Sequence, residues 1–593
     1  MKLSIIISAL TATVFFSGCK DYLDQVPNDR ITIEEVFRKK ASSEQYLANV
    51  YSYVPDLSNQ WSDNPWLGNS DELDVTWTKY SNYALNLGNI SAGTVLFDKW
   101  GNLYAGIRSA TYFINHIDEN VEILALNGQA QIDRYKAEAR FLRAYFYFLV
   151  MQQFGPAVLV GDKELPAGAT AADMQIPRSH YDTCVNYIAA ELDAAAAVLP
   201  LRPMNNDQVS DAEYGRATKG IALAVKSRLL LYAASPQYNG NTDVATFKDK
   251  DGKPLISQTY DATKWARAAA AAKDVIDLGI YSLYEDVSGD PVKSLQGVFL
   301  QAWNNEQIFV RKSNGLSNWD VHCMPRSAGG WCGMAPTQEQ VDAYFMNDGL
   351  SINESSNYSE TGFTDVAGLS VYNMYINREP RFYAHITYNN SRFQGGNMQA
   401  MGTITFFVSS PNGKNGHPTD FSKTGYLVRK NVGTQTNDGS GGNGAKQNRP
   451  YVLFRLAEMY LNYAEALNES DPGNTDITKY LNLVRKRAGI PQYGEGASPL
   501  PVPGGQPEMR AKIRAERRVE LAFECHRWFD MRRWKIVAQH MGDMHGMNVN
   551  RDGNDFYQRS VAATHLFRPA MYWFPISQYE MDRGKQIIQN PGW

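Results

Sequence analysis

The sequence predicts a mostly α-helical protein, in which repeated helix pairs form a scaffold and a large insertion of loops and short strands interrupts it. Three observations support this fold class: helix pairs with alternating small and large residues, a middle region without that rhythm, and a globular composition. Hydrophobic residues make up 44% and charged residues 20% of the 593 residues, which argues against disorder. We expect one domain over 19–593, with the scaffold at about 30–280 and 450–593 and the insertion at about 281–449.

Helical segments recur at both ends of the chain. They are predicted, in order, at 33–54 with Thr32 as the N-cap, 100–126, 132–154, 218–236, 265–278, 454–467 and 477–488. The stretch 61–96 is rich in Trp, Asn, Gly, Ser and Asp, which favours loops.

The helix pairs resemble tetratricopeptide repeats. Trp100, Leu103 and Ile107 fit the first helix of such a repeat. The partner helix alternates small and large residues on one face: Ala137, Phe141, Ala144 and Phe148. Small residues let two helices approach closely, and aromatic residues fill the groove between them. The spacing between pairs is irregular, so the pattern indicates a degenerate, interrupted repeat.

The region between 281 and 448 lacks helical periodicity. Short apolar segments at 307–311, 382–388 and 403–408 are typical of strands or hairpins. The tract 433–444 is nearly all Gly, Asn, Ser, Thr and Asp, which predicts a flexible loop. We interpret the whole region as an insertion on a helical scaffold.

The chain opens with a short leader that ends at a cysteine. Lys2 precedes an apolar run over 3–16, and Ser17 and Gly18 lead into Cys19. This pattern predicts a signal peptide over 1–18 and resembles a bacterial lipobox, although Phe16 stands where Leu is usual. Lipidated Cys19 would anchor the protein to a membrane without a spanning helix. The alternative is an ordinary cleaved signal with an incidental Cys.

The residues after Cys19 are acidic, in the order Lys-Asp-Tyr-Leu-Asp over 20–24. They resemble the tag that sends some Gram-negative lipoproteins to the outer face of the outer membrane. Net charge excludes another partner class: the formal charge is −4, whereas nucleic-acid binding needs a basic footprint.

Four cysteines remain after Cys19, and two of them are close in sequence. Cys323 and Cys332 could bridge a surface loop, since an extracellular compartment permits disulfides. Two free thiols are the equal alternative, because pairing cannot be deduced from sequence alone.

A series of ordered motifs resembles the SusD/RagB family of outer-membrane nutrient-binding lipoproteins and covers nearly all of the mature chain. The motifs are 19–23 (CKDYL), 138–145 (EARFLRAY), 154–156 (FGP), 336–337 (PT), 348–349 (DG), 455–466 (RLAEMYLNYAEA), 483–489 (LVRKRAG), 513–524 (IRAERRVELAFE), 526–534 (HRWFDMRRW), 574–576 (FPI) and 589–593 (QNPGW). Cys525 departs from the family, which usually has Gly there.

The resemblance implies a helical fold with four tetratricopeptide-like units and a looped insertion. It also implies a surface lipoprotein that sits as a lid on a SusC-like TonB-dependent barrel transporter, captures a glycan and delivers it to the channel. The alternatives are a peptide-binding lid of the same fold, a surface glycoside hydrolase and a purely structural adaptor.

Ligand-binding candidates are aromatic residues in polar, loop-like settings, because a sugar offers a flat C–H face and a rim of hydroxyls. We expect Trp66 and Trp77 with Asn69 and Asp71, and Trp319 and Trp331 with Arg326, to contact ligand. Two glycines before Trp331 would let its ring reach solvent. The alternative for each Trp is packing under a loop; Trp100, Trp265, Trp528 and Trp534 are assigned to the scaffold.

Signals for an enzyme are weak. The chain has no H-E-x-x-H, no Walker loop and no G-x-S-x-G. Asp71, Glu72 and Asp74 could offer an acid and a base for glycoside hydrolysis, but carboxylates that bind hydroxyls would look the same. We therefore expect a binding protein without a cofactor or a metal. The charged stretch 514–524 is interpreted as salt-bridged rungs along one helix.

Overall fold

The computed structural model describes residues 33–58, 64–164, 168–170, 172–205, 208–312, 314–395, 398–434 and 447–593. These residues are mostly helical, which confirms the predicted fold class. The predicted signal peptide over 1–18 and Cys19 lie outside the described residues, as does most of the tract 433–444. Among the helices in these ranges, none is both long enough and apolar enough to cross a membrane.

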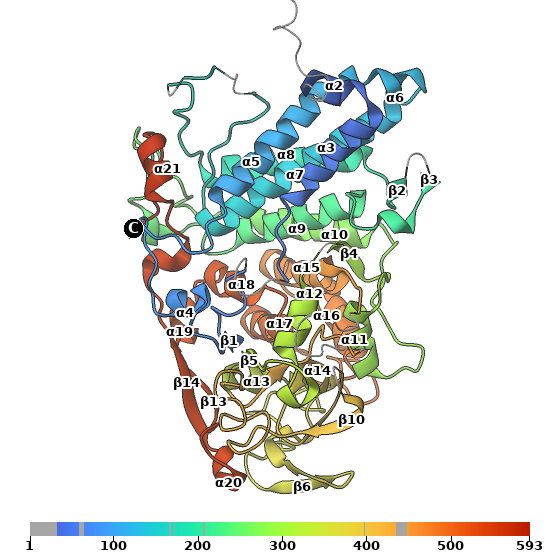
Figure 1. Ribbon diagram of the computed structural model, residues 1–593, viewed down its shortest axis with the longest axis vertical. Helices are drawn as coiled ribbons and strands as arrows, with labels where there is room; N and C mark the ends of the chain where they lie inside the picture. Colours follow the sequence, from blue (N-terminus) through green and yellow to red (C-terminus); the bar gives the residue numbers. More distant parts are fainter. Residues whose placement is uncertain are drawn as a thin grey trace, which may run out of the picture.

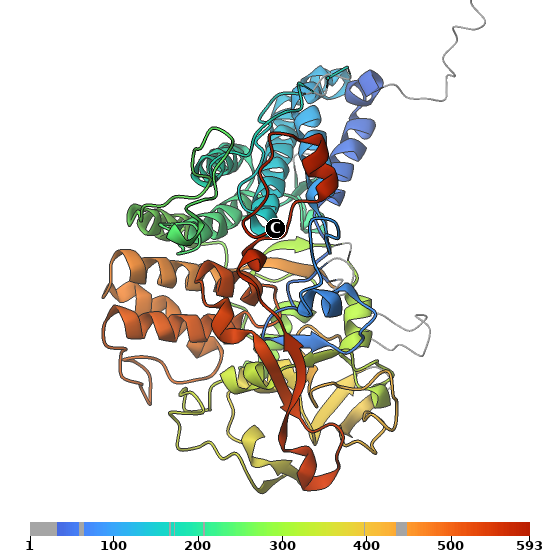
Figure 2. The same cartoon turned by 90° about the vertical axis from the view of Figure 1, so that its left-hand side faces the viewer.

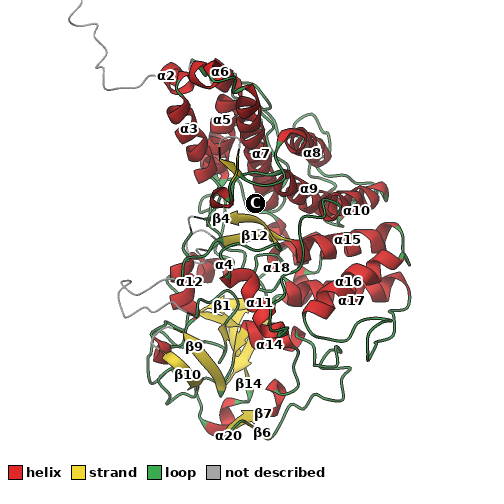
Figure 3. Cartoon of the chain, turned by 90° about the vertical axis from the view of Figure 1, so that its right-hand side faces the viewer, coloured by secondary structure: helices red, strands yellow, loops and turns green. Residues whose placement is uncertain are grey.

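The scaffold helices pack in a row, each against the next (Figure 1). The first five are α5 (Trp100–His116), α7 (Gln129–Phe154), α8 (Tyr181–Val198), α9 (Lys219–Ala234) and α10 (Thr263–Ile276). Helix α10 then packs against α15 (Leu456–Ser470), although the whole middle region separates them in sequence. Helices α16 (Thr475–Arg487) and α17 (Gly505–Glu520) extend the row from α15, as Figure 3 shows.

The N-terminal helices are shorter than the sequence predicts. The segment 33–54 forms α2 (Ile33–Arg38) and α3 (Lys40–Ser52), because Lys39 between them has an extended backbone. The segment 100–126 also divides, with α5 ending at His116. The Asn120 side chain then accepts a hydrogen bond from the Ile123 amide at 2.9 Å and caps a new helix, α6 (Val121–Ala125).

Helices α5 and α7 approach closely at Gly106. A Cβ there would lie 2.9 Å from Cε2 of Phe146 and 3.0 Å from Cβ of Tyr53. Any larger side chain would force these helices apart, so Gly106 sets their spacing.

The middle region contains short antiparallel strand pairs among helices and loops. β4 (Gln307–Arg311) is the predicted strand 307–311 and pairs with β12 (Tyr451–Arg455). The predicted helix from 454 therefore starts two residues later, at Leu456. The other pairs are β6 (Phe363–Val366) with β7 (Leu369–Tyr372), β8 (Ile386–Thr387) with β11 (Leu427–Val428), and β9 (Ser391–Gly395) with β10 (Met398–Ile404).

The predicted strand at 382–388 is wrong over most of its length. Residues 380–385 form helix α14 (Pro380–His385), and only β8 is extended. Pro380 occupies the first turn of α14, where its fixed φ favours a helix and its missing N–H costs nothing.

A long hairpin and several short helices complete the fold. The hairpin, β13 (Gly542–Met547) with β14 (Arg559–His565), runs down the flank of the molecule to its strand-rich end (Figure 2). The short helices are α4 (Ser81–Asn86), α11 (Pro291–Leu300), α12 (Leu316–Cys323), α13 (Gln338–Ala343), α18 (Arg527–Arg533), α19 (Val537–His540), α20 (Gly553–Phe556) and α21 (Gln578–Arg583).

A buried ion network joins α17 to three neighbouring elements. The Glu520 carboxylate accepts hydrogen bonds from Arg455 at 2.7 Å, from Arg381 at 3.2 Å and from Arg487. All four side chains are buried. The prediction of rungs along one helix is wrong here, because the partners of Glu520 come from β12, α14 and α16.

Candidate ligand-binding surface

A short strand ladder brings two distant tryptophans together. β1 (Leu73–Val75) pairs antiparallel with β5 (Met334–Pro336), and the Thr76 amide donates to the Gly333 carbonyl at 3.0 Å. Just beyond the ladder, the rings of Trp77 and Trp331 meet edge to face, with centroids 6.3 Å apart.

His322 completes the cluster. Its ring centroid lies 4.7 Å from that of Trp77 and 5.0 Å from that of Trp331. We call Trp77, His322 and Trp331 the aromatic platform. Trp331 is 39% exposed, Trp77 is half-buried and His322 is buried, so the two indoles form the accessible surface. Burial, with a contribution from nearby Lys79, lowers the pKa of His322 to about 3, so this ring is neutral at neutral pH.

Polar side chains from the middle region form a rim beside the platform. The Asp420 carboxylate accepts a hydrogen bond from Trp77 Nε1 at 2.8 Å. The same carboxylate lies 3.8 Å from Arg326 Nη1 and 3.4 Å from His417 Nδ1. Exposed indoles beside charged hydrogen-bonding groups suit a ligand with an apolar face and a hydroxyl rim.

Glycines permit this arrangement. Gly329 has a φ of +85°, and a Cβ on Gly330 would lie 2.1 Å from the Met324 carbonyl oxygen. A Cβ on Gly333 would lie 2.0 Å from Cη2 of Trp77. The expectation that glycines let the Trp331 ring reach solvent is confirmed.

Two predicted ligand-binding tryptophans lie in the core instead. The Trp66 ring packs against Phe529 with centroids 4.8 Å apart. Trp319 is 3% exposed, and its Nε1 donates to the Lys430 carbonyl at 3.3 Å. These contacts remove both rings from the surface. The four tryptophans assigned to the scaffold are buried as predicted: Trp100, Trp265, Trp528 and Trp534.

The predicted polar contacts Asn69 and Asp71 are buried as well. Asn69 Nδ2 donates to the Asn82 carbonyl at 2.8 Å. Both Asp71 oxygens accept from Arg527, at 2.7 and 2.8 Å, and Arg518 lies 3.1 Å away. Burial alone would raise the pKa of Asp71, but these guanidiniums hold it below its ordinary value.

The neighbouring acidic residues Glu72 and Asp74 are also buried. Burial raises the pKa of Glu72 to about 8, and its Oε1 accepts from the Phe523 amide at 3.0 Å. Asp74 is buried and accepts from Lys423 Nζ at 2.6 Å. Because neither faces open space, these carboxylates cannot act as the acid and base of a surface glycosidase.

Cys323 and Cys332 are free, buried thiols, so the possible disulfide of a surface loop is not formed. Backbone hydrogen bonds hold the loop instead. The Trp331 amide donates to the Val321 carbonyl and the Gly333 amide to the His322 carbonyl, both at 2.7 Å.

We expect the lipid-free native chain to show no reactive thiol. The four described cysteines are Cys184, Cys323, Cys332 and Cys525, all free and buried, and burial raises the pKa of Cys332 to about 12. Buried thiols that are not ionised react slowly. Titration with an aromatic disulfide reagent should therefore find all four only after unfolding in denaturant. If only two thiols react after unfolding, Cys323 and Cys332 form a disulfide after all.

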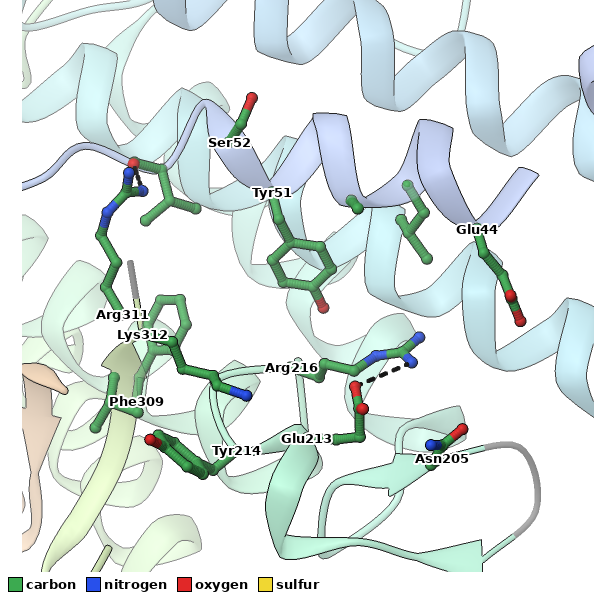
Figure 4. A pocket seen from close by; sticks show the side chains of 15 residues that line it. Glu44, Tyr51, Ser52, Asn205, Glu213, Tyr214, Arg216, Phe309, Arg311 and Lys312 are labelled. Carbon is green, nitrogen blue, oxygen red and sulfur yellow. Dashed lines mark hydrogen bonds and ion pairs between the residues drawn. The ribbon is translucent and has the colours of Figure 1, made fainter. Parts of the chain in front are cut away.

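A separate cleft of about 560 Å³ lies between α3, β4 and the turn after the 3-10 helix η4 (Asp211–Glu213). Figure 4 shows Tyr51, Arg216 and Lys312 facing it from these three elements. This cleft and the Asp420 rim could not be predicted from the sequence, because each is assembled from segments far apart in the chain. No local motif marks these residues.

Comparisons with known proteins agree with this architecture. Residues 299–593 match the family described as "SusD family", and residues 21–231 match "Starch-binding associating with outer membrane". The solved structure of BT4246 covers 94% of this chain and all of its own, with a TM-score of 0.81 and 26% identity. A SusD-like carbohydrate binding protein from Bacteroides fragilis covers 93% of this chain and 99% of its own, with a TM-score of 0.68 and 21% identity.

Two curated relatives come from Formosa agariphila. SusD-like protein P25 is 22% identical over 569 residues, which is 92% of each chain. SusD-like protein P2 is 41% identical over 134 residues, which is 22% of this chain and 26% of that protein.

Proposed function

This chain belongs to the SusD/RagB family, and from that premise we propose that it captures a glycan on the cell surface and delivers it to a barrel transporter. The family is one of glycan-binding proteins without catalytic activity. The observation that supports the proposal best is the aromatic platform. Trp331 offers an exposed ring and Trp77 a half-buried one, beside the rim of Arg326 and Asp420.

The platform has the chemistry of a sugar site. The indole faces can stack on the C–H face of a sugar ring, while the Arg326 guanidinium and the Asp420 carboxylate can donate to and accept from its hydroxyls. Since the Trp77 ring is held by the Asp420 hydrogen bond and by Gly333, little side-chain freedom is lost on binding. Trp77, Trp331 and Arg326 are therefore the predicted residues that we retain as ligand contacts.

The leader that ends at Cys19 supports a lipid anchor, and the family assignment supports a transporter partner. We propose that Cys19 carries lipid and holds the protein at the outer membrane, and that a SusC-like TonB-dependent barrel receives the glycan. The names of the matched family and of the B. fragilis neighbour, which refer to starch and carbohydrate binding, support a carbohydrate as ligand.

Calorimetric titration of residues 20–593 against oligosaccharides, polysaccharides and peptides tests the proposal. We expect binding to one glycan class, with the glycan recovered at its original length by chromatography. Shortened glycan would contradict the assignment to a non-catalytic family. Binding to peptides alone would favour the peptide-binding lid. If no glycan binds, the proposal that the protein captures a glycan is wrong.

A further inference from the structure

We propose that the cleft between α3 and β4 is a second binding site, for a small saccharide that carries a carboxylate. It is formed by elements other than those of the aromatic platform and does not depend on the platform's role. Its volume of about 560 Å³ lies within the range of small-molecule sites, roughly 300–1,000 Å³.

One end of the cleft holds a positioned ammonium group. Lys312 Nζ donates to the Ala212 carbonyl at 2.6 Å and lies 4.8 Å from the ring centroid of Tyr214. The Tyr214 ring stacks on Trp303, with centroids 5.3 Å apart and planes at 28°. The carbonyl and the stacked ring hold the cation where Figure 4 shows it, facing the cleft.

Arg311 adds a second cation at the same end. Its Nη1 donates to the Val54 carbonyl, and its Nε is buried without a hydrogen-bond partner. Within the described ranges, no carboxylate lies within 4.0 Å of the charged nitrogens of Arg311 or Lys312. Arg311 is partly buried, and a partly buried cation without a counter-charge is costly, so a bound anion would remove that cost. Lys312 is exposed and adds a positive charge that an anion can reach.

The third cation of the cleft differs from these two because it is already neutralised. Arg216 donates to the two Glu138 oxygens at 2.8 and 3.1 Å, and its Nη1 lies 3.7 Å from Glu213. An incoming carboxylate is therefore expected to bind at Lys312 and Arg311 rather than at Arg216.

The other end of the cleft offers groups that suit hydroxyls. Glu44 accepts from Tyr135 at 2.6 Å through Oε1, which leaves its second oxygen for a ligand. Asn205 lines this end as well, and Phe309 contributes an apolar surface beside Arg311 and Lys312 (Figure 4). A cationic end, an apolar wall and hydroxyl acceptors together match an acidic sugar better than a neutral one.

The test uses the mature chain carrying Trp331→Ala, which removes the main exposed ring of the platform. Titration with a galacturonate disaccharide, and with its uncharged methyl ester, is compared in three chains: this background, Lys312→Met and Lys312→Arg. We expect Lys312→Met and the methyl ester each to weaken binding at least about tenfold, and Lys312→Arg to stay within about threefold, because the anion needs a positive charge at this place. Exposed Lys250→Met is the matched control and should change nothing.

Two results would overturn this site. The first is no binding of the disaccharide in the Trp331→Ala background, and the second is an affinity that Lys312→Met leaves unchanged. A short peptide that binds there more tightly than the disaccharide would overturn the ligand class. All of these titrations use a chain in which the platform is disabled, so they do not test the proposed function at the platform. If the platform itself fails to bind glycan, the test of the cleft remains valid.

Discussion

Replacing Glu520 by Gln is expected to lower the free energy of unfolding by about 3–5 kcal/mol, the usual cost of removing one partner of a buried ion pair. The carboxylate is shared by Arg381, Arg455 and Arg487, which come from α14, β12 and α16. These arginines also pair with other buried carboxylates: Glu306, Glu379, Glu516 and Glu524. A neutral amide would leave these buried guanidiniums short of negative charge and would also offer a donor where only an acceptor fits.

The stability of the wild-type protein should depend on pH through the same carboxylate. Burial would raise the pKa of Glu520, but the surrounding guanidiniums hold it well below its ordinary value. A carboxyl whose pKa is lower in the folded state stabilises the fold at neutral pH, and that stability is lost as the pH falls through the ordinary and then the folded pKa.

Urea unfolding followed by far-ultraviolet circular dichroism measures the Glu520 effect. Glu285→Gln, at an exposed carboxylate, is the control and should stay within about 0.5 kcal/mol of wild type. If Glu520→Gln unfolds at the same urea concentration as this control, the network does not hold the scaffold together.

Replacing Trp331 by Ala is expected to weaken glycan binding by about 2 kcal/mol, or roughly 30-fold, the size typical of a central aromatic contact. The 39% exposed ring presents most of the accessible face of the platform. Because the ring is only partly buried, stability should fall by no more than about 1–2 kcal/mol.

Titration with the glycan identified in the panel measures this loss. Tyr579→Ala removes another exposed aromatic side chain, on α21, and should leave the affinity unchanged. Trp331→Phe keeps a smaller ring and should lie between wild type and Trp331→Ala. Equal affinities for wild type and Trp331→Ala would place the glycan away from the platform.

Much of the helical scaffold could be predicted from the sequence. The segments predicted at 218–236 and 265–278 form α9 (Lys219–Ala234) and α10 (Thr263–Ile276), and 307–311 forms β4. These elements depend on local periodicity, caps and turn residues, which are properties of neighbouring residues. The break at Lys39 and the helix at Pro380 were not predicted. Each depends on the backbone conformation of one or two residues, which is too short a stretch to show periodicity.

The ligand-binding surface could be predicted only in part, because burial is a property of the whole fold. Trp319 and Trp331 occupy the same polar stretch, yet the Lys430 carbonyl and the core cover Trp319 while glycines leave Trp331 in solvent. Composition and spacing could not distinguish them.

By itself, the sequence determined the fold class, the family, and the order and approximate limits of most scaffold helices, since these follow from short-range patterns and ordered motifs. The tertiary structure alone decided which aromatic rings are exposed, that Cys323 and Cys332 remain unpaired, and that Glu520 binds three other elements rather than its own helix. It also assembled the cleft at Lys312. The physical reason is that burial, ion pairing and cavities depend on which distant segments come together, and the local sequence of one segment does not show which segments will contact it.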